Sequence, residues 1–220
     1  MNIKRQLACI YTTNFFSGLR ITDAVWVALL AARGFSLWEI GLAESVLHIV
    51  SLLFEIPSGM VADLLGRKKT LVFGGFLGVV ANILMAFAPN LFFICFAMGL
   101  NAISNTMFSG TSTALVYDSL KQADCAEDYI KVSANSSLIS TAASAIGSLT
   151  STLAQFLHFT GFYLLSALFE FISAFANVLM AEPVVTEAQA NRKQQTCPVS
   201  LPNWCATACA HFAPARWPSG

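Results

Sequence analysis

The chain has 220 residues, of which 56% are hydrophobic and 11% are charged, and its mean hydropathy is +0.65. A water-soluble domain carries about a quarter charged residues, so this composition excludes an ordinary soluble domain. The equal numbers of acidic and basic residues, 12 of each, indicate no basic surface of the kind that binds nucleic acid. Most of the chain is therefore expected to contact the lipid bilayer.

Windows of about 20 apolar residues, the length that a helix needs to cross a bilayer, predict six membrane spans. Barrel strands would be shorter and would alternate apolar with polar residues. We therefore predict an all-α membrane protein with six transmembrane helices. The predicted spans are Leu7–Ala31, Ile40–Val61, Thr70–Ala88, Leu91–Val116, Val132–Leu157 and Phe159–Met180.

The basic residues predict the orientation, because cytoplasmic loops carry an excess of lysine and arginine. With the amino terminus inside, the outer loops hold only Arg33. The cytoplasmic segments then hold Lys4, Arg5, Arg67, Lys68, Lys69, Lys121, Lys131, Arg192, Lys193 and Arg216. The basic start resembles a signal peptide, but the apolar run that follows is longer than twenty residues. We expect an integral protein of the cell (inner) membrane, with a retained first span and both termini cytoplasmic.

The first span carries two ionisable residues, Arg20 and Asp23, three positions apart. This spacing puts them on one helical face, where they can neutralise each other. Burying ionisable groups in a membrane is costly, so such residues usually have a function or form an ion pair. Either they form an ion couple that stabilises the bundle, or one of them engages a substrate or a coupling proton.

A polar stripe follows the second span through Glu44, His48, Ser51 and Glu55. Steps of four, three and four residues place these side chains on one face, which must meet protein or water rather than lipid. His48 is the candidate for a proton relay, because imidazole is the side chain that changes its charge near neutral pH. Solvated helix ends and a packing role for His48 are the alternatives.

The connection between spans two and three reads Gly59-x3-Asp63-x2-Gly66-Arg67-Lys68 and is similar to the signature loop of the major facilitator superfamily of secondary transporters. Two more segments, Phe54–Gly59 before this loop and Ser109–Leu120 at the end of span four, resemble a bacterial branch of that family. The resemblance covers about Leu7 to Pro183. It implies a carrier of twelve helices in two six-helix halves, with the substrate site between them.

By this resemblance the chain corresponds to the amino-terminal half. We expect that a second half would be supplied by a homodimer or by a separate chain. The alternative is a truncated half-carrier that does not transport and has a structural or interaction role.

In the family, the signature loop latches the two halves together, which assigns a gating role to Gly59, Asp63, Gly66, Arg67 and Lys68. The residues themselves predict an ion pair between Asp63 and Arg67 and a tight turn or close helix approach at the two glycines. A role as simple inside-positive anchors is the alternative for the basic residues.

Spans four to six offer further polar groups. Asn101 and Asn105 in span four could line a cavity, since this span faces the central pathway in the family, or they could bond neighbouring helices. Span six places Glu170 near the middle of the membrane, where it either is protonated and bonded to Asn177 or a neighbouring helix, or belongs to an interface. Span five carries a seam of small residues that predicts a helix contact face, formed by Ser133, Ser137, Ser140, Ser144, Gly147 and Ser151.

The composition changes after Pro183, which ends the predicted membrane domain (1–183) and begins a linker and tail (184–220). Three cysteines and a histidine in the tail lack the C-x2-C spacing of zinc sites. The sequence predicts no metal, no cofactor and no catalytic constellation. The unusual composition from Thr196 to Gly220 suggests a frameshift or early stop in a gene for a full carrier.

The sequence as a whole favours secondary active transport of a small solute by alternating access, as proton-coupled efflux of a drug-like compound. The residues predicted for the substrate and proton pathway are Arg20, Asp23, Glu44, His48, Asn101, Asn105 and Glu170. An uptake carrier and the half-carrier without transport remain the alternatives.

Overall fold

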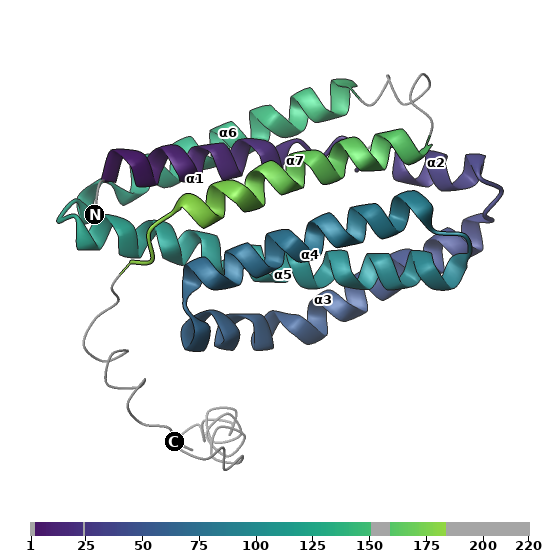
Figure 1. Cartoon of the computed structure of the whole chain (residues 1–220), viewed down its shortest axis with the longest axis horizontal. Helices are drawn as coiled ribbons and strands as arrows, with labels where there is room; N and C mark the ends of the chain where they lie inside the picture. The colour runs from purple at the N-terminus through teal and green to yellow at the C-terminus, as the bar shows by residue number, and fades with distance from the viewer. Residues whose placement is uncertain (1–2, 24, 151–158, 184–220) are drawn as a thin grey trace, which may run out of the picture. The chain divides into compact units, whose positions relative to one another are not determined.

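The computed structural model describes residues 3–23, 25–150 and 159–183 (Figure 1). The predictions for Ser151, for the end of the fifth span and for the tail from residue 184 onward lie outside these residues. The described helices are α1 (Ile3–Gly18), α2 (Trp26–Ala32), α3 (Leu37–Leu65), α4 (Arg67–Phe87), α5 (Leu91–Gln122), α6 (Tyr129–Thr150) and α7 (Phe159–Leu179). A 3-10 turn, Ala126–Asp128, precedes α6. Within these residues the fold is all-α, as predicted.

Four helices of the described part are long and apolar enough to cross a membrane: α3, α4, α5 and most of α7. They match the second, third, fourth and sixth predicted spans. The fifth predicted span corresponds to α6, of which the structure describes 22 residues. The chain is therefore an integral membrane protein, while the predicted number of six spanning helices is not established.

The first predicted span, Leu7–Ala31, is not one continuous helix, and this prediction was wrong. The chain leaves the helix after Gly18 and resumes it only at Trp26. In between, the backbone N–H of Arg20 donates to the carbonyl of Gly18 at 2.8 Å, so a two-residue turn replaces the helical bond to the fourth residue back. A hydropathy window averages over such a break, because a few polar residues hardly change its mean.

The remaining helix ends follow from local sequence. Ser36 begins α3 with a capping box, in which its hydroxyl accepts from the N–H of Glu39 and the Glu39 carboxylate accepts from the N–H of Ser36. Asn90 caps α5 by accepting from the N–H of Phe93 at 3.2 Å. Gly66 separates α3 from α4 with φ of 103° and ψ of 148°, a conformation that is essentially reserved for glycine.

Small residues decide how the helices pack. α4 packs against both α5 and α7, α3 packs against α5, and α1 packs against α6 and α7 (Figure 1). On α4, a Cβ added at Gly75 would lie 2.8 Å from the Cβ of Ala174, and one added at Gly74 would lie 3.0 Å from that of Met107. No larger residue fits there, so α4 sits at the centre of these contacts.

The predicted contact seam on α6 is confirmed at three positions. A Cβ at Gly147 would lie 3.2 Å from the backbone N of Arg20, and one at Gly18 would lie 2.9 Å from the carbonyl oxygen of Ser140. The hydroxyl of Ser144 donates to the carbonyl of Gly18 at 3.0 Å. The partner of this seam is the end of α1.

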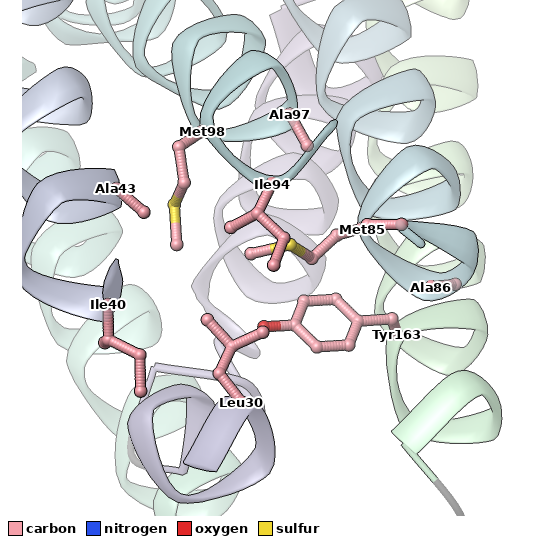
Figure 2. Close-up of a cluster of buried hydrophobic side chains, with 10 residues drawn as sticks. Leu30, Ile40, Ala43, Met85, Ala86, Ile94, Ala97, Met98 and Tyr163 are labelled. Carbon is pink, nitrogen blue, oxygen red and sulfur yellow. The ribbon is translucent and has the colours of Figure 1, made fainter. Parts of the chain in front are cut away.

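Two clusters of buried apolar side chains form the core. The first, shown in Figure 2, brings Leu30 from α2 and Tyr163 from α7 together with Met85 and Ile94. The second lies at the opposite end, where α1 begins and α7 ends, and contains Ile10, Leu71, Leu115, Val116, Leu120, Val132 and Met180. We call that end of the bundle the basic end, because Lys4, Arg5, Arg67, Lys68, Lys69, Lys121 and Lys131 lie in or beside the helix termini that meet there.

The surface of α3 is strongly apolar. Leu52, Ile56 and Leu64 are 76%, 70% and 70% exposed, and only 11% of the apolar window of this helix is buried within the described bundle. Such a surface is incompatible with water, so it contacts lipid or another apolar protein surface.

Candidate functional site

A cavity of about 440 Å³ lies between the two apolar clusters. Six long helices, α1 and α3 to α7, contribute side chains to it, together with α2 and the turn between α1 and α2. Its volume is in the range of small-molecule sites, about 300–1,000 Å³. Its polar and charged lining residues are Ser17, Arg20, Thr22, Asp23, Glu44, Asn82, Asn101, Ser104, Asn105, Ser140, Tyr163, Ser166 and Glu170.

The cavity brings together six of the seven residues predicted for the pathway. Arg20 and Asp23 come from the turn after α1, Glu44 from α3, Asn101 and Asn105 from α5, and Glu170 from α7. His48 is the exception. Its Nε2 lies 3.2 Å from Oε1 of Glu44, and its side chain is 71% exposed, outside the described lining. His48 therefore reaches the cavity only through Glu44.

The predicted pair of Arg20 and Asp23 is confirmed, with Nη1 of the arginine 3.4 Å from Oδ2 of the aspartate. The pair sits in the turn that interrupts the first predicted span, not on a continuous helix. The two side chains are 55% and 61% exposed, and an exposed pair of this kind contributes little to stability. Both charges thus remain accessible from the cavity.

Glu170 lies against Gly78 of α4 and Ser104 of α5. A Cβ added at Gly78 would lie 3.1 Å from Oε1 of Glu170 and 2.9 Å from Oγ of Ser104. Only a glycine at position 78 leaves room for this carboxyl group. The positive charge of Arg20 acts on this carboxyl group, and Arg20 also pairs with Asp23 at the cavity.

The predicted bond between Glu170 and Asn177 is not what the structure contains. The side-chain amide oxygen Oδ1 of Asn177 instead accepts from the hydroxyl of Thr13 on α1, at 2.9 Å. Helix α7 runs antiparallel to α1. Asn177 lies two turns beyond Glu170 on α7, so it meets a different part of α1. Glu170 lines the cavity, and its role at an interface with another protein stays a prediction.

The two asparagines of α5 bond to each other. Nδ2 of Asn105 donates to Oδ1 of Asn101 at 2.7 Å. Each amide keeps further donor and acceptor capacity, and both side chains line the cavity. They are thus positioned to hydrogen-bond a polar ligand.

The residues of the signature loop lie at the basic end, away from the cavity. The predicted pair of Asp63 and Arg67 was wrong: Nε of Arg67 lies 2.9 Å from Oδ2 of Asp118 on α5. The sharp turn at Gly66 separates the two helices, so Arg67 opens α4 and faces α5, while Asp63 stays on the exposed surface of α3.

Two functional contacts at this end were missed by sequence reasoning. Glu182, just after α7, accepts from the backbone N–H of Lys68 at 3.4 Å and meets Gly66, so a carboxylate faces the amino-terminal end of α4. Asp118 belongs to the segment Ser109–Leu120 that carried the family resemblance, and this is the signal that could have identified it.

Gly59 lies within α3 with no atom within 4 Å of an added Cβ, so the structure assigns it no close approach.

Comparisons with known proteins place relatives of this chain among transporters. The chain is 31% identical over 101 residues to an uncharacterized MFS-type transporter of Bacillus subtilis (strain 168), covering 44% of this chain and 25% of that protein. It is 27% identical over 93 residues to an uncharacterized transporter of Buchnera aphidicola subsp. Schizaphis graminum (strain Sg), covering 42% of this chain and 23% of that protein. The aligned segments thus span about a quarter of each relative. The family described as Major Facilitator Superfamily matches residues 8–216, and the chain therefore belongs to the Major Facilitator Superfamily.

Proposed function

We propose that the chain takes part in secondary active transport, and that the cavity binds the transported small solute. The observation that carries this proposal is the convergence of six widely separated polar or ionisable residues on one cavity of about 440 Å³. Burying such groups in a membrane protein is costly, and they therefore mark substrate or ion pathways. The named relatives are transporters, which supports the same function.

The finer proposal is proton-coupled efflux of a drug-like compound. Glu170, Asp23 and Glu44 are carboxylates that can exchange a proton at the cavity, and its lining includes the aromatic side chains of Phe16, Trp26, Phe108, Tyr163 and Phe169. Aromatic surface with a few polar groups is typical of sites for drug-like ligands. Uptake in the opposite direction uses the same groups, so the direction is a separate question for experiment.

The partners belong to the same proposal. The exposed apolar surface of α3 supports association with a second helical unit, from another copy or a separate chain, and the solute passes between the two. We place the protein in the cell (inner) membrane with the basic end cytoplasmic, because the positive charges gather there. The residues of the signature loop then act as a gate on the cytoplasmic side.

Reconstitution tests the transport proposal. The purified chain in liposomes, with an imposed proton gradient, is assayed for flux of drug-like cations and of sugars, and crosslinking reports whether dimers form. Asp23→Asn and Glu170→Gln are expected to reduce flux. Asp128→Asn is the matched control, because Asp128 forms a comparable exposed pair with Lys131, at 3.1 Å, far from the cavity.

The alternative is a half-carrier with a structural or interaction role. A strictly monomeric chain that carries no solute under any gradient supports that role and contradicts transport by this chain. Flux that the cavity variants leave unchanged would instead show that the solute takes a different path.

A further inference from the structure

A seam between α1 and α7 joins the cavity to the basic end of the bundle. The two helices lie side by side (Figure 1) and run in opposite directions. Three interactions follow one another along the seam, at Gln6, Thr13 and Arg20, which are seven residues apart in α1 and the turn after it. Near the cavity, the charge of Arg20 acts on Glu170; further down, the hydroxyl of Thr13 donates to Oδ1 of Asn177 at 2.9 Å. At the basic end, Gln6 exchanges hydrogen bonds with the backbone of Ala181, at 3.1 and 2.8 Å.

The α7 side of this seam contains buried polar atoms without a partner in the described residues. Ser173 and Asn177 are both 0% exposed. The Oγ of Ser173 and the Nδ2 of Asn177 make no hydrogen bond to any described group. Buried polar atoms are nearly always satisfied by protein or by internal water, and a buried water molecule typically bonds two to four such groups.

The spacing along α7 suits bridging water. Glu170, Ser173 and Asn177 are separated by three and four residues, and side chains at these spacings lie about 5–6 Å apart on a helix. Two hydrogen bonds of about 2.8 Å each span that distance through one water molecule. Below Asn177 the seam closes, because Ile10 and Met180 belong to the apolar cluster of the basic end.

We propose that Ser173 and Asn177 hold internal water between α1 and α7, and that this water is the route by which Glu170 exchanges its proton on the side away from the cavity. The proton moves between the carboxyl group of Glu170 and the bound water without any other bond being broken. This inference rests on the proposed proton coupling. Ile10, Met180 and the Gln6 contact keep the route closed toward the basic end in this conformation.

The charges around Glu170 are consistent with such a role. Arg20, after α1, is the cation whose charge acts on it, while Asp23, Glu44 from α3 and Tyr163 from α7 share its cavity. α4 and α5 present only the neutral polar side chains of Asn82, Asn101, Ser104 and Asn105. Proton exchange at Glu170 is therefore expected to respond to Arg20 and to the seam, rather than to α4 or α5.

The first test asks whether the seam holds water, using thermal unfolding of the whole chain in detergent. Ser173→Ala removes the hydroxyl; if that hydroxyl holds water, the variant should unfold about 2–4 °C lower. If the seam is dry, removing an unpartnered buried hydroxyl raises the unfolding temperature, and the proposal is overturned. Ser136→Ala is the control, since Ser136 on α6 also has a buried unpartnered hydroxyl but lies outside the seam.

The second test follows the proton itself by infrared spectroscopy of the chain in lipid. The band of a protonated carboxyl group that Glu170→Gln removes belongs to Glu170, and its shift in D₂O reports proton exchange. Asn177→Leu is expected to slow that exchange at least about tenfold, while Ser136→Ala leaves it unchanged. The absence of such a band, or an unchanged rate in Asn177→Leu, would refute the route. Because neither measurement needs a transported solute, a failure of the flux assay is distinguishable from a failure of this inference.

Discussion

The Nε of Arg67 lies 2.9 Å from the Oδ2 of Asp118, and this pair ties the start of α4 to the last turns of α5. Only 16% of the arginine side chain and 11% of the aspartate side chain are exposed. Losing one member of a buried pair leaves an uncompensated charge, which is more costly than losing both. The signature loop therefore stabilises the packing of α4 against α5, in addition to its proposed role as a gate.

Asp118→Asn should lower the free energy of unfolding by about 3–5 kcal/mol, because Arg67 then stays buried without its counter-charge. Thermal unfolding in detergent measures this. Asp63→Asn, in the same loop region but exposed, should change stability by no more than about 0.5 kcal/mol. Equal losses in both variants would show that Asp63 supports the fold as much as Asp118 does, and would contradict the pairing of Arg67 with Asp118 alone.

Two glycines of the signature loop should respond in opposite directions. Gly66→Ala is expected to destabilise the protein by about 1–3 kcal/mol, because its backbone conformation suits only glycine and the new Cβ would lie 2.6 Å from Oε1 of Glu182. Gly59→Ala lies in a helix with open space around it and should stabilise by about 0.5–1 kcal/mol. Unfolding temperatures that fall by the same amount in both variants would contradict this reading of the loop.

Gln6 on α1 is expected to stabilise the contact of α1 with α5 and with the segment that follows α7. Its amide donates to the hydroxyl of Ser119 at 3.2 Å and bonds the backbone of Ala181 on both sides. Gln6→Leu removes the partner of the part-buried N–H of Ala181 and leaves the buried hydroxyl of Ser119 without its donor, which should cost about 1–3 kcal/mol. Thr12→Val is the control, since the exposed hydroxyl of Thr12 bonds only the carbonyl of Ala8 within its own helix. Similar unfolding curves for Gln6→Leu and the wild type would show that these hydrogen bonds do not stabilise the fold.

Gly78→Ala tests the geometry of the cavity. Its Cβ would press on both Ser104 and Glu170, so the Glu170 carboxyl group must move. We expect solute affinity or flux to fall at least about tenfold, as for a disturbed binding geometry worth 1.4 kcal/mol. Gly110→Ala, on α5 with no atom within 4 Å of its added Cβ, should leave flux unchanged. A Gly78→Ala variant that transports normally would argue against Glu170 as a ligand of the solute.

The sequence by itself determined that the chain is a helical membrane protein, because span length and the absence of charge do not depend on how helices pack. It also identified the cavity residues Arg20, Asp23, Glu44, Asn101, Asn105 and Glu170, since an ionisable or amide group is costly in lipid wherever it lies. The seam of small residues on α6 could also be predicted from the sequence, because a close approach of two helix backbones requires small side chains.

Tertiary structure alone decided which of these groups meet. The partner of Arg67 is Asp118, 51 positions away along the chain, and no local spacing rule can rank it above Asp63. The close approach of Gly18, at the end of α1, to Ser140 on α6 is likewise a contact between distant parts of the chain. The contact of Glu182 with the start of α4 depends on where α7 ends. Such contacts join helices that are far apart in sequence, so they follow from the packing of small residues between helices and not from the composition of any one helix.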